Sequence, residues 1–382
     1  MDTDLPPPNP PANNPPPIPP PLLSRPPYAQ PPRKRNGWKI LSLVLIVVLV
    51  VVLGSSMLDI FHGLVAGPVG QSHLGGPKLE EQILEHHDSD HKIAVIPVEG
   101  IITSDGLDRG GYSMIDLIED QLEMAARDKK VKAVLLKVNS PGGEVLASDD
   151  INRAITDFQT RSGKPVVASM GSLAASGGYY VSVPCRWIVA NELTITGSIG
   201  VIMHALNYRG LMDKVGLRSE VFKSGKFKDM LSGTKKEEEI TTEERMMVQK
   251  LVDETFARFK QVVAEGRQQA NSKNEDSKAS KGRTLSSRWE DFADGRVLSG
   301  KEAFELGFVE EQGNFETAVS RARDLAGIKD ANLVQYHQIF DLSSLLHLFG
   351  KTETPALKVD LGLDAPKLKA GQLYFLSPTF VH

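Results

Sequence analysis

The stretch GSLAASGGYY at residues 171–180 decides how this chain folds. An apolar run at 164–170 comes before it and is entered through a proline, which is typical of a buried strand. A short segment at 179–183 comes after it and stops at Pro184, which predicts a short helix. Ser176 therefore lies at a strand-to-helix switch, where helix N–H groups can face developing negative charge. Its small neighbours leave room for another backbone, although the same residues also suit a tightly packed helix start without chemistry.

Predicted strands and helices alternate on both sides of this stretch. Apolar runs predict strands and i, i+3, i+4 spacings predict helices. These segments are, in chain order, 92–98 (strand), 113–127 (helix), 131–138 (strand), 151–158 (helix), 186–190 (strand), 196–202 (turn and strand) and 318–326 (helix). Such alternation predicts an α/β fold with a mostly parallel sheet. Both glycine loops, at 139–143 and 171–178, follow the carboxyl ends of strands, where α/β folds place their sites.

Other segments are less regular. Thr241-x-x-Glu244 is a capping box that opens a long helix. Residues 266–287 are polar and predict a mobile insertion, whereas 307–311 predicts a closing strand. Residues 79–84 suggest a short helix, and the tail from about 330 has only a weak pattern.

The N-terminal part of the 382-residue chain predicts a membrane anchor. Fifteen of the 24 prolines fall within the first 32 residues, so 1–36 should be a disordered tail, and its PxxP-like runs are also compatible with an SH3-type ligand. Basic residues then precede a run of Ile, Leu and Val, which predicts a transmembrane anchor at 37–60 with the tail in the cytoplasm. A buried core helix is the alternative. We expect a linker at 61–91, a folded domain at 92–326 and a C-terminal tail at 327–382.

Composition excludes several classes of function. A net charge of −4 gives no electrostatic reason to expect nucleic-acid binding. The single cysteine, Cys185, excludes an internal disulfide framework and lies in an apolar neighbourhood, where we expect it to be buried and inert. The sequence has no phosphate-binding glycine loop and no paired Cys or His spacing for a metal, so we expect neither cofactor nor metal.

A serine nucleophile needs a base, and histidine is scarce where the fold is expected. Eight of the nine histidines lie outside 92–326, and His204 alone lies inside. A Ser-His-Asp triad is therefore poorly supported. Lysine is the other recognised partner, and the segment KSGKFKD at 223–229 supplies three. Spacing does not choose among these three, and the segment could instead be a solvated basic loop.

Two further serines in glycine turns, Ser140 and Ser198, are rival nucleophiles. Ser140 precedes a proline, where capping of the turn is its most common role. Gly142 and Gly143 could aim a free N–H at an oxyanion, or could form only a turn.

Five motifs, taken together, resemble one family. The chain resembles the signal peptide peptidase A family of bacterial membrane-bound Ser-Lys proteases over about residues 92–326. The motifs are VNSPGG (138–143), MGSLAASGGYY (170–180), TITGSIGV (194–201), KSGKFKD (223–229) and DGRV (294–297). The resemblance implies a ClpP/crotonase-like fold, a repeated ββα superhelix with a mostly parallel sheet.

The resemblance also implies a role for each matching residue. Ser176 corresponds to the nucleophile and Lys228 to the general base. Gly143 corresponds to an oxyanion-hole residue, with the Gly177 N–H as second donor, and Ser198 to the hydroxyl that orients the lysine. Only one copy of each motif is present, as in the short members, which form rings in which one protomer's serine meets its neighbour's lysine.

The function implied is a membrane-anchored serine endopeptidase without cofactor or metal. Its place would be the bacterial cytoplasmic membrane, with a cytoplasmic N-terminus and an extracytoplasmic catalytic domain. Its substrates would be peptides with small apolar side chains beside the scissile bond, such as the remnants of cleaved signal peptides. The alternatives are a membrane protease of the same fold acting on other membrane or exported proteins, an acyl-CoA enzyme of the crotonase type, and a non-catalytic membrane scaffold. The proline-rich tail, the 266–287 segment and the C-terminal tail depart from the family.

Overall fold

The computed structural model describes residues 77–106, 112–275, 282–338 and 372–377. These residues belong to one compact unit, His73–His382. The predicted proline-rich tail and the predicted anchor at 37–60 lie outside the described residues. Within the described ranges, no helix combines the length and the apolar character that crossing a bilayer requires.

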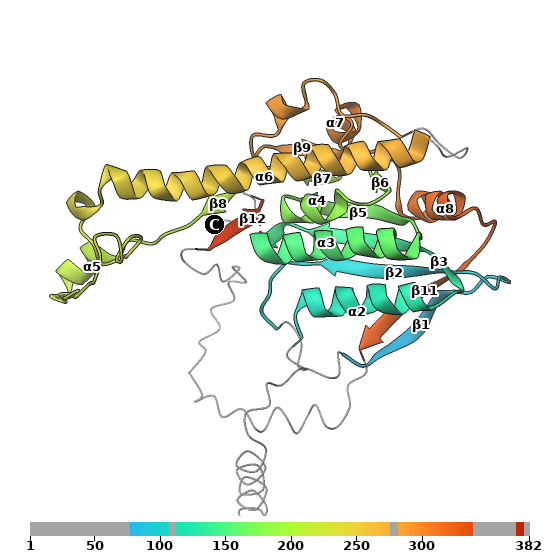
Figure 1. The fold of residues 1–382 in the computed structure, drawn as a ribbon, viewed down its shortest axis with the longest axis horizontal. Coiled ribbons are helices and arrows are strands. Elements are labelled where there is room, and N and C mark those ends of the chain that lie inside the picture. The colour runs from blue at the N-terminus through green and yellow to red at the C-terminus, as the bar shows by residue number, and fades with distance from the viewer. Residues whose placement is uncertain (1–76, 107–111, 276–281, 339–371, 378–382) are drawn as a thin grey trace, which may run out of the picture. The chain divides into compact units, whose positions relative to one another are not determined.

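A nine-stranded sheet forms the centre of this unit (Figure 1). Its main path runs β1-β11-β2-β3-β5-β6-β10, and β7 and β9 branch from β5. Every pair in it is parallel except β1 with β11 and β7 with β9. The strands are β1 (Leu79–Glu85), β2 (Lys92–Glu99), β3 (Val131–Ser140), β5 (Val166–Ala175), β6 (Trp187–Ala190), β7 (Ile195–Gly197), β9 (Val297–Ser299), β10 (Glu311–Gln312) and β11 (Asn332–Gln338). The prediction of an α/β fold with a mostly parallel sheet is confirmed, and the repeated superhelix stays a prediction.

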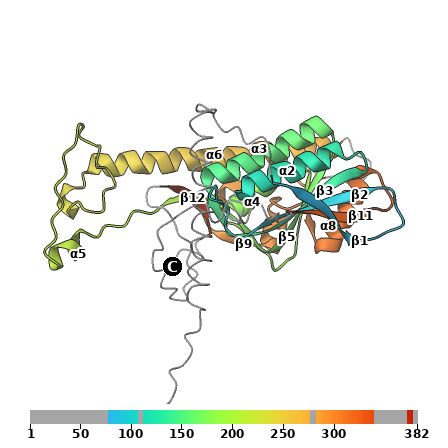
Figure 2. The same ribbon diagram turned by 90° about the horizontal axis from the view of Figure 1, so that it is seen from below.

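Helices cover both faces of the sheet, with α2 and α3 on one side and α8 on the other (Figure 2). The helices are α2 (Met114–Arg127), α3 (Val145–Ser162), α4 (Gly177–Ser182), α5 (Arg209–Lys214), α6 (Thr242–Glu275), α7 (Gly300–Glu305) and α8 (Phe315–Ala326), with 3-10 turns at Glu237–Glu239 and Trp289–Phe292. In β2, Ala94 and Ile96 face the α2 and α3 layer, whereas Ile93 and Val95 face α8. Successive side chains of a strand point to opposite faces, so an apolar run fits a sheet that is covered twice.

The strand-to-helix switch lies where the sequence predicts it. β5 runs as far as Ala175, Ser176 follows, and α4 begins at Gly177. The last part of β5 pairs with β7, from Leu173 with Ile195 to Ala175 with Gly197. The segment that carries Ser176 is therefore fixed from the side by a neighbouring strand.

A second, three-stranded sheet has the order β4-β12-β8. It consists of β4 (Gly142–Glu144), β8 (Ile202–Met203) and β12 (Leu373–Leu376), and β12 is antiparallel to both neighbours. The glycines predicted as a turn at 139–143 therefore contribute the start of a strand. The C-terminal segment that pairs with them has only a weak pattern in the sequence.

Helix α6 corrects the prediction of a mobile insertion at 266–287. Its capping box is confirmed, because Glu244 N–H donates to Thr241 Oγ1 at 3.2 Å and Thr241 N–H donates to the Glu244 carboxylate at 2.9 Å. The helix continues to Glu275, so the prediction is wrong for residues 266–275. Polar residues are tolerated there because they have internal partners. Arg267 is buried, donates to the Val183 carbonyl at 2.8 Å and pairs with Glu310 at 3.0 Å.

Two shorter predictions are also wrong. Residues 79–85 form strand β1 rather than a helix, because β11 supplies an antiparallel partner from the far end of the sequence. Most of 307–311 is not a strand, because the Phe308 N–H bonds to the Ala303 carbonyl at the end of α7. Only Glu311–Gln312 belongs to the sheet there, as β10.

Candidate active site

Ser176 occupies a strained position between β5 and α4. Its φ of 54° and ψ of −115° are unusual for a residue with a side chain. Its side chain is fully buried, and its hydroxyl has no hydrogen-bond partner among the residues that the structure describes. Backbone strain of this kind gathers at functional sites, and hydrolases place a nucleophilic serine on just such a turn.

The surrounding backbone holds Ser176 in this conformation. Its N–H donates to the Gly197 carbonyl at 2.8 Å, and its carbonyl accepts from the Tyr180 N–H at 2.8 Å. Gly197 belongs to β7, so one bond ties the serine to the sheet and the other ties it to α4. The hydroxyl is left free for chemistry.

Gly177 and Gly143, the two predicted oxyanion-hole residues, lie beside each other. A methyl group added at Gly177 would lie 3.1 Å from the Gly143 nitrogen and 3.0 Å from the Gly142 α-carbon. A methyl at Gly178 would lie 2.7 Å from the Ser140 carbonyl oxygen. Two chain segments, 140–143 and 177–178, therefore meet here at a distance that only glycine permits. Backbone N–H groups so placed can stabilise a tetrahedral oxyanion beside Ser176.

Ser198, the predicted lysine-orienting residue, lies next to this cluster. It follows Gly197, has a φ of 49°, and donates its N–H to the Arg296 carbonyl at 2.7 Å. Its buried side chain lines a hollow together with Asp294, Gly295 and Leu376. Arg296 donates a hydrogen bond to Asp294 and lowers the pKa of that carboxyl to about 2. The Asp294 carboxylate is therefore already paired with an arginine.

The rival serines have other roles. The hydroxyl of Ser140 accepts a hydrogen bond from the Gly142 N–H at 3.1 Å, which is the turn-capping role that the sequence suggests for it. Ser172 is exposed within β5, four residues before Ser176. Neither has the strained backbone that Ser176 and Ser198 share.

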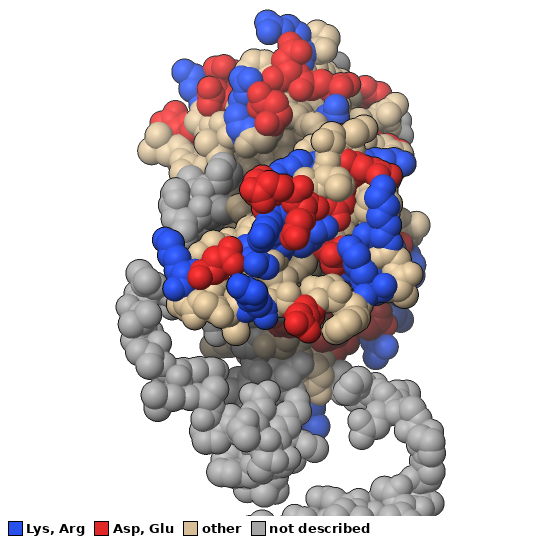
Figure 3. Space-filling view, turned by 90° about the vertical axis from the view of Figure 1, so that its left-hand side faces the viewer, with Lys and Arg blue, Asp and Glu red and all other residues tan. Residues whose placement is uncertain are grey.

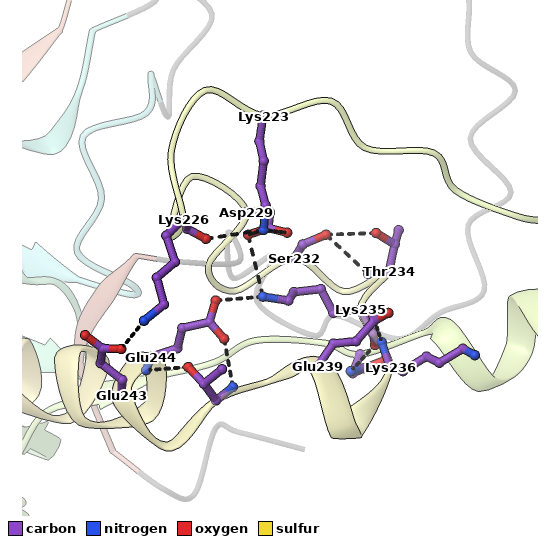
Figure 4. Close-up of polar contacts among 12 residues, drawn as sticks. Lys223, Lys226, Asp229, Ser232, Thr234, Lys235, Lys236, Glu239, Glu243 and Glu244 are labelled. Carbon is purple, nitrogen blue, oxygen red and sulfur yellow. Dashed lines mark hydrogen bonds and ion pairs between the residues drawn. The ribbon is translucent and has the colours of Figure 1, made fainter.

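The three lysines of 223–229 differ in their partners, and Figure 4 shows those of Lys223 and Lys226. Lys223 pairs with Asp229 at 2.8 Å, and Lys226 pairs with Glu243 at 2.5 Å. Lys228 is exposed, and in the part of the chain that the structure describes its amine has neither a hydrogen bond nor an ion pair. A carboxylate partner favours the ammonium form of a lysine, so Lys223 and Lys226 are the less suited to act as a base, and the assignment of Lys228 stays a prediction.

Lys228 and Ser176 are far apart within one chain. The loop that carries Lys228 is fixed through Lys226 to Glu243, in the first turn of α6. Tyr180 lies four residues after Ser176, and the centroid of its ring is 4.9 Å from that of Phe259. Phe259 lies much farther along α6 than Glu243 does. Sixteen residues of helix separate Glu243 from Phe259, which corresponds to about 24 Å. Figure 1 shows the α5 end of α6 well away from α4. The fold thus brings together Ser176, Gly143, Gly177 and Ser198, but not Lys228.

Other candidates lie apart from this chemistry. His204 is exposed after β8 and lines the same hollow as Ser198, without a hydrogen bond to Ser176. Cys185 is buried, and burial raises the pKa of its thiol to about 12. Among the described residues, no group of three His, Cys, Asp or Glu side chains is placed to hold a metal ion.

Strand β12 is the part of the site that sequence reasoning missed. Its residues Phe375 and Leu376 pair with Gly143 and Gly142 of β4, beside Ser176. The available signal was a run of four large apolar residues between Gly371 and Pro378, which is a common pattern for a short strand.

Comparison with known proteins matches this chain to a family of peptidases. The model of peptidase family S49 matches residues 159–329. The chain is 36% identical over 266 residues to a signal peptide peptidase SppA of Enterococcus faecium, covering 69% of this chain and 72% of the relative. It is 35% identical over 274 residues to a protease of Synechocystis sp., covering 71% of this chain and 88% of the relative.

A solved structure of a ClpP1 point mutant from Listeria monocytogenes is similar over 59% of this chain and 94% of that chain, with 16% identity and a TM-score of 0.32. The relatives establish the family at the level of sequence. With its buried, strained serine, this chain is a serine endopeptidase that belongs to peptidase family S49, the family of signal peptide peptidase A.

Proposed function

We propose that this chain is a membrane-anchored endopeptidase whose catalytic dyad consists of Ser176 of one copy and Lys228 of another. The observation that carries the proposal is that the two parts of a serine–lysine site lie in separate regions of one chain. Ser176 has a hydroxyl without a hydrogen-bond partner among the described residues, beside glycine N–H groups. Lys228 lies on a loop that contacts the start of α6, about 24 Å along the helix from Phe259, which contacts Tyr180 of α4.

The chemistry is acyl transfer through Ser176. The neutral amine of Lys228 takes the proton from Ser176 Oγ, which attacks the peptide carbonyl carbon. The N–H groups of Gly143 and Gly177 hold the oxyanion until the C–N bond breaks and the leaving amine receives the proton from the lysine. Water, activated by the same lysine, then hydrolyses the ester, releases the acid and restores Ser176. The hydroxyl of Ser198 orients the lysine.

The surface around Lys228 supports contact with a second copy. The segment 205–222 exposes large apolar side chains, of which Phe222 is 93%, Leu206 77% and Leu211 64% exposed. Apolar surface of this extent is typical of protein interfaces. On this face Lys and Arg side chains are interspersed with Asp and Glu, so no repulsive block of one charge opposes self-association (Figure 3). A neighbour that covers this segment could bring its Ser198 hollow to Lys228.

The anchor and the substrate rest on the sequence and on the family. Basic residues before the apolar run at 37–60 favour a span with a cytoplasmic N-terminus and a catalytic domain on the other side of the membrane. The Enterococcus faecium relative carries the name of a signal peptide peptidase. Peptides left in the membrane after signal cleavage are therefore the proposed substrates.

Hydrolysis of a quenched fluorescent peptide by the full chain in detergent tests the proposal. We expect Ser176→Ala and Lys228→Ala each to lower kcat by about 10³-fold or more, since members of a dyad act as a unit. The matched control is Lys226→Ala, two residues away, which removes only a surface ion pair and should retain most of the activity. Activity of Lys228→Ala equal to that of Lys226→Ala would contradict the assigned base.

A further inference from the structure

The short helix α4 directly follows the candidate nucleophile, and its far end is held by a buried arginine. Gly177, whose N–H is a predicted oxyanion donor, is the first residue of α4. At the opposite end Val183 follows the helix, and Pro184 cannot continue it. Arg267 of α6 donates to the Val183 carbonyl at 2.8 Å and to the Cys185 carbonyl at 3.2 Å. One guanidinium therefore binds the carbonyl groups at the end of α4, where the helix carries partial negative charge.

The charge of Arg267 is balanced inside the protein by Glu310. Their side chains are 0% and 2% exposed, and a guanidinium nitrogen lies 3.0 Å from one carboxylate oxygen. The other carboxylate oxygen accepts the Ile188 N–H of β6 at 2.8 Å. The pair thus connects α6, the end of α4 and the central sheet.

A buried ion pair adds little net stability, because the lost hydration of two charges offsets their attraction. Apolar side chains of similar volume often stabilise a fold as well or better. What the pair supplies instead is direction, since a guanidinium presents its donors in one plane and at fixed angles. The pair of Arg267 and Glu310 is therefore suited to fix the position of the end of α4.

Helix α6 also approaches this end of α4 closely (Figure 1). A methyl group added at Gly266, next to Arg267, would lie 2.4 Å from a methyl carbon of Val183 and 3.0 Å from the Val183 carbonyl oxygen. Two neighbouring residues of α6 therefore hold the end of α4, one by close contact and one by hydrogen bonds.

Ser176 needs such support because its backbone is strained. Its φ of 54° and ψ of −115° persist only where the surrounding structure enforces them. A helix of six residues is only about 9 Å long, so a shift at Val183 is passed on to Gly177 at the other end. A misplacement of about 1 Å can lower a rate about a hundredfold, so the hold on the far end of α4 matters for catalysis.

We propose that Arg267 and Glu310 are positioning residues of the hydrolytic reaction, which hold the far end of α4 so that Ser176 and the Gly177 N–H stay aligned for attack on a peptide carbonyl. The inference rests on the proposed peptidase function with Ser176 as nucleophile. Both side chains are buried at the opposite end of α4 from Ser176 and do not bind the substrate. Their removal should therefore lower kcat and leave KM nearly unchanged.

A double variant of the full chain tests the inference. Arg267→Met with Glu310→Gln removes both charges and keeps an acceptor for the Ile188 N–H. Because no lone charge is left in the interior, this chain should fold. We expect its kcat for a quenched fluorescent peptide to fall about 10²-fold, with KM within about twofold of wild type.

The control applies the same replacements to a neighbouring pair. Glu311 lies 2.9 Å from Arg321 of α8 and accepts the Trp187 indole N–H at 2.9 Å, on the other face of the sheet. Arg321→Met with Glu311→Gln should keep its kcat within about twofold. An equal loss of kcat in both double variants, or an unchanged kcat in the folded Arg267→Met, Glu310→Gln chain, would overturn the inference.

A milder variant applies if the first double variant does not fold. Arg267→Lys keeps a cation for Glu310, but one amine cannot reproduce the planar donors that bind both carbonyl groups. We expect its kcat to fall about tenfold, and a kcat equal to that of wild type would overturn the inference.

Hydrogen exchange of the amides at 177–183 gives a readout that does not need activity. We expect exchange to be about tenfold faster in Arg267→Met, Glu310→Gln than in wild type, and unchanged in the control. If the wild-type chain hydrolyses no peptide, the peptidase proposal fails, and the exchange rates alone decide whether the pair holds α4. Equal exchange in wild type and the double variant would then overturn that hold.

Discussion

At the scale of single residues, the site depends on backbone that closes around Ser176. The scarcity of histidine in the predicted folded domain indicates that the base is a lysine. The backbone N–H and carbonyl of Ser176 are both hydrogen-bonded, whereas its hydroxyl has no partner among the described residues and can donate its proton to such a base. Gly142 is a tight point, because its φ of 100° suits glycine and a methyl group on its α-carbon would overlap two other chain segments. A side chain there would collide with β12 and with the residue that follows Ser176.

Gly142→Ala should therefore strongly reduce peptide hydrolysis. Its methyl group overlaps the Phe375 carbonyl and the Gly177 nitrogen, so β12 and the predicted oxyanion donors must move, and we expect a loss of about 10²-fold or more in kcat. The matched control is Gly163→Ala at the end of α3, where φ is 69° and no atom lies within 4 Å of the added methyl. It should cost about 1 kcal/mol of stability and keep its activity. Thermal unfolding and peptide hydrolysis measure both, and an active Gly142→Ala chain would contradict the assigned geometry.

At the scale of elements, α6 acts as the support on which the Lys228 loop is docked. Lys235 pairs with Glu244 at 2.6 Å, and Glu244 also accepts the Thr241 N–H of the capping box (Figure 4). The hydrogen bond from Lys235 lowers the pKa of the Glu244 carboxyl, and the same bond raises the pKa of Lys235. One carboxylate thus joins the loop to the start of the helix.

This pair predicts a pH-dependent contribution to stability. Because the folded pKa of Glu244 is lowered, the contribution is complete above the ordinary glutamate pKa of about 4.3 and is lost as the pH falls through the folded pKa. Glu244→Gln should be less stable than wild type by about 1 kcal/mol at pH 7. The difference should shrink as the pH falls below about 4.

Urea unfolding of both chains across this pH range measures the effect. Glu237→Gln serves as the control, because Glu237 is 73% exposed and its pair with Arg245 is at the surface. If the difference in unfolding free energy between wild type and Glu244→Gln stays constant from pH 7 to pH 3, ionisation of the Glu244 carboxyl does not contribute to stability.

At the scale of the whole molecule, the proposed dyad requires two chains. The α5 end of α6 carries Lys228 and exposed apolar side chains, whereas the sheet carries Ser176 and the glycines. Neither region is complete alone. In a closed ring every proposed active site has both a serine and a lysine, because each chain contributes its serine to the site shared with one neighbour and its lysine to the site shared with the other.

Mixing two inactive variants tests this arrangement. Ser176→Ala and Lys228→Ala chains, reassembled together in equal amounts, should recover roughly a quarter of wild-type activity, because random assortment pairs an intact serine with an intact lysine at one interface in four. Peptide hydrolysis before and after mixing, with size measurement to show joint assembly, gives the result. Mixed assemblies without any recovered activity would place both members of the dyad in one chain.

Several features follow from the sequence alone. The apolar side chains of runs such as 131–138 are buried on both faces of the strand, because helices cover both faces of the parallel sheet. The Ser113 and Thr241 capping boxes begin helices where expected, since they bond backbone groups only three residues away. The residues next to Ser176 in the sequence likewise determine its position between a strand and a helix.

Other features depend on contacts between distant parts of the chain. β12 pairs with β4 through backbone groups that every residue type has, so no side-chain pattern identifies the partner strand. Residues 266–275 look like a solvated segment because the partners of Arg267 lie more than 40 positions away along the chain. Residue types and local periodicity determined the sheet, the helix starts and the serine. Only the tertiary structure decided which lysines have carboxylate partners, where Lys228 lies and which strand pairs with β4, because ion pairs and strand pairing join segments whose separation in sequence carries no signal.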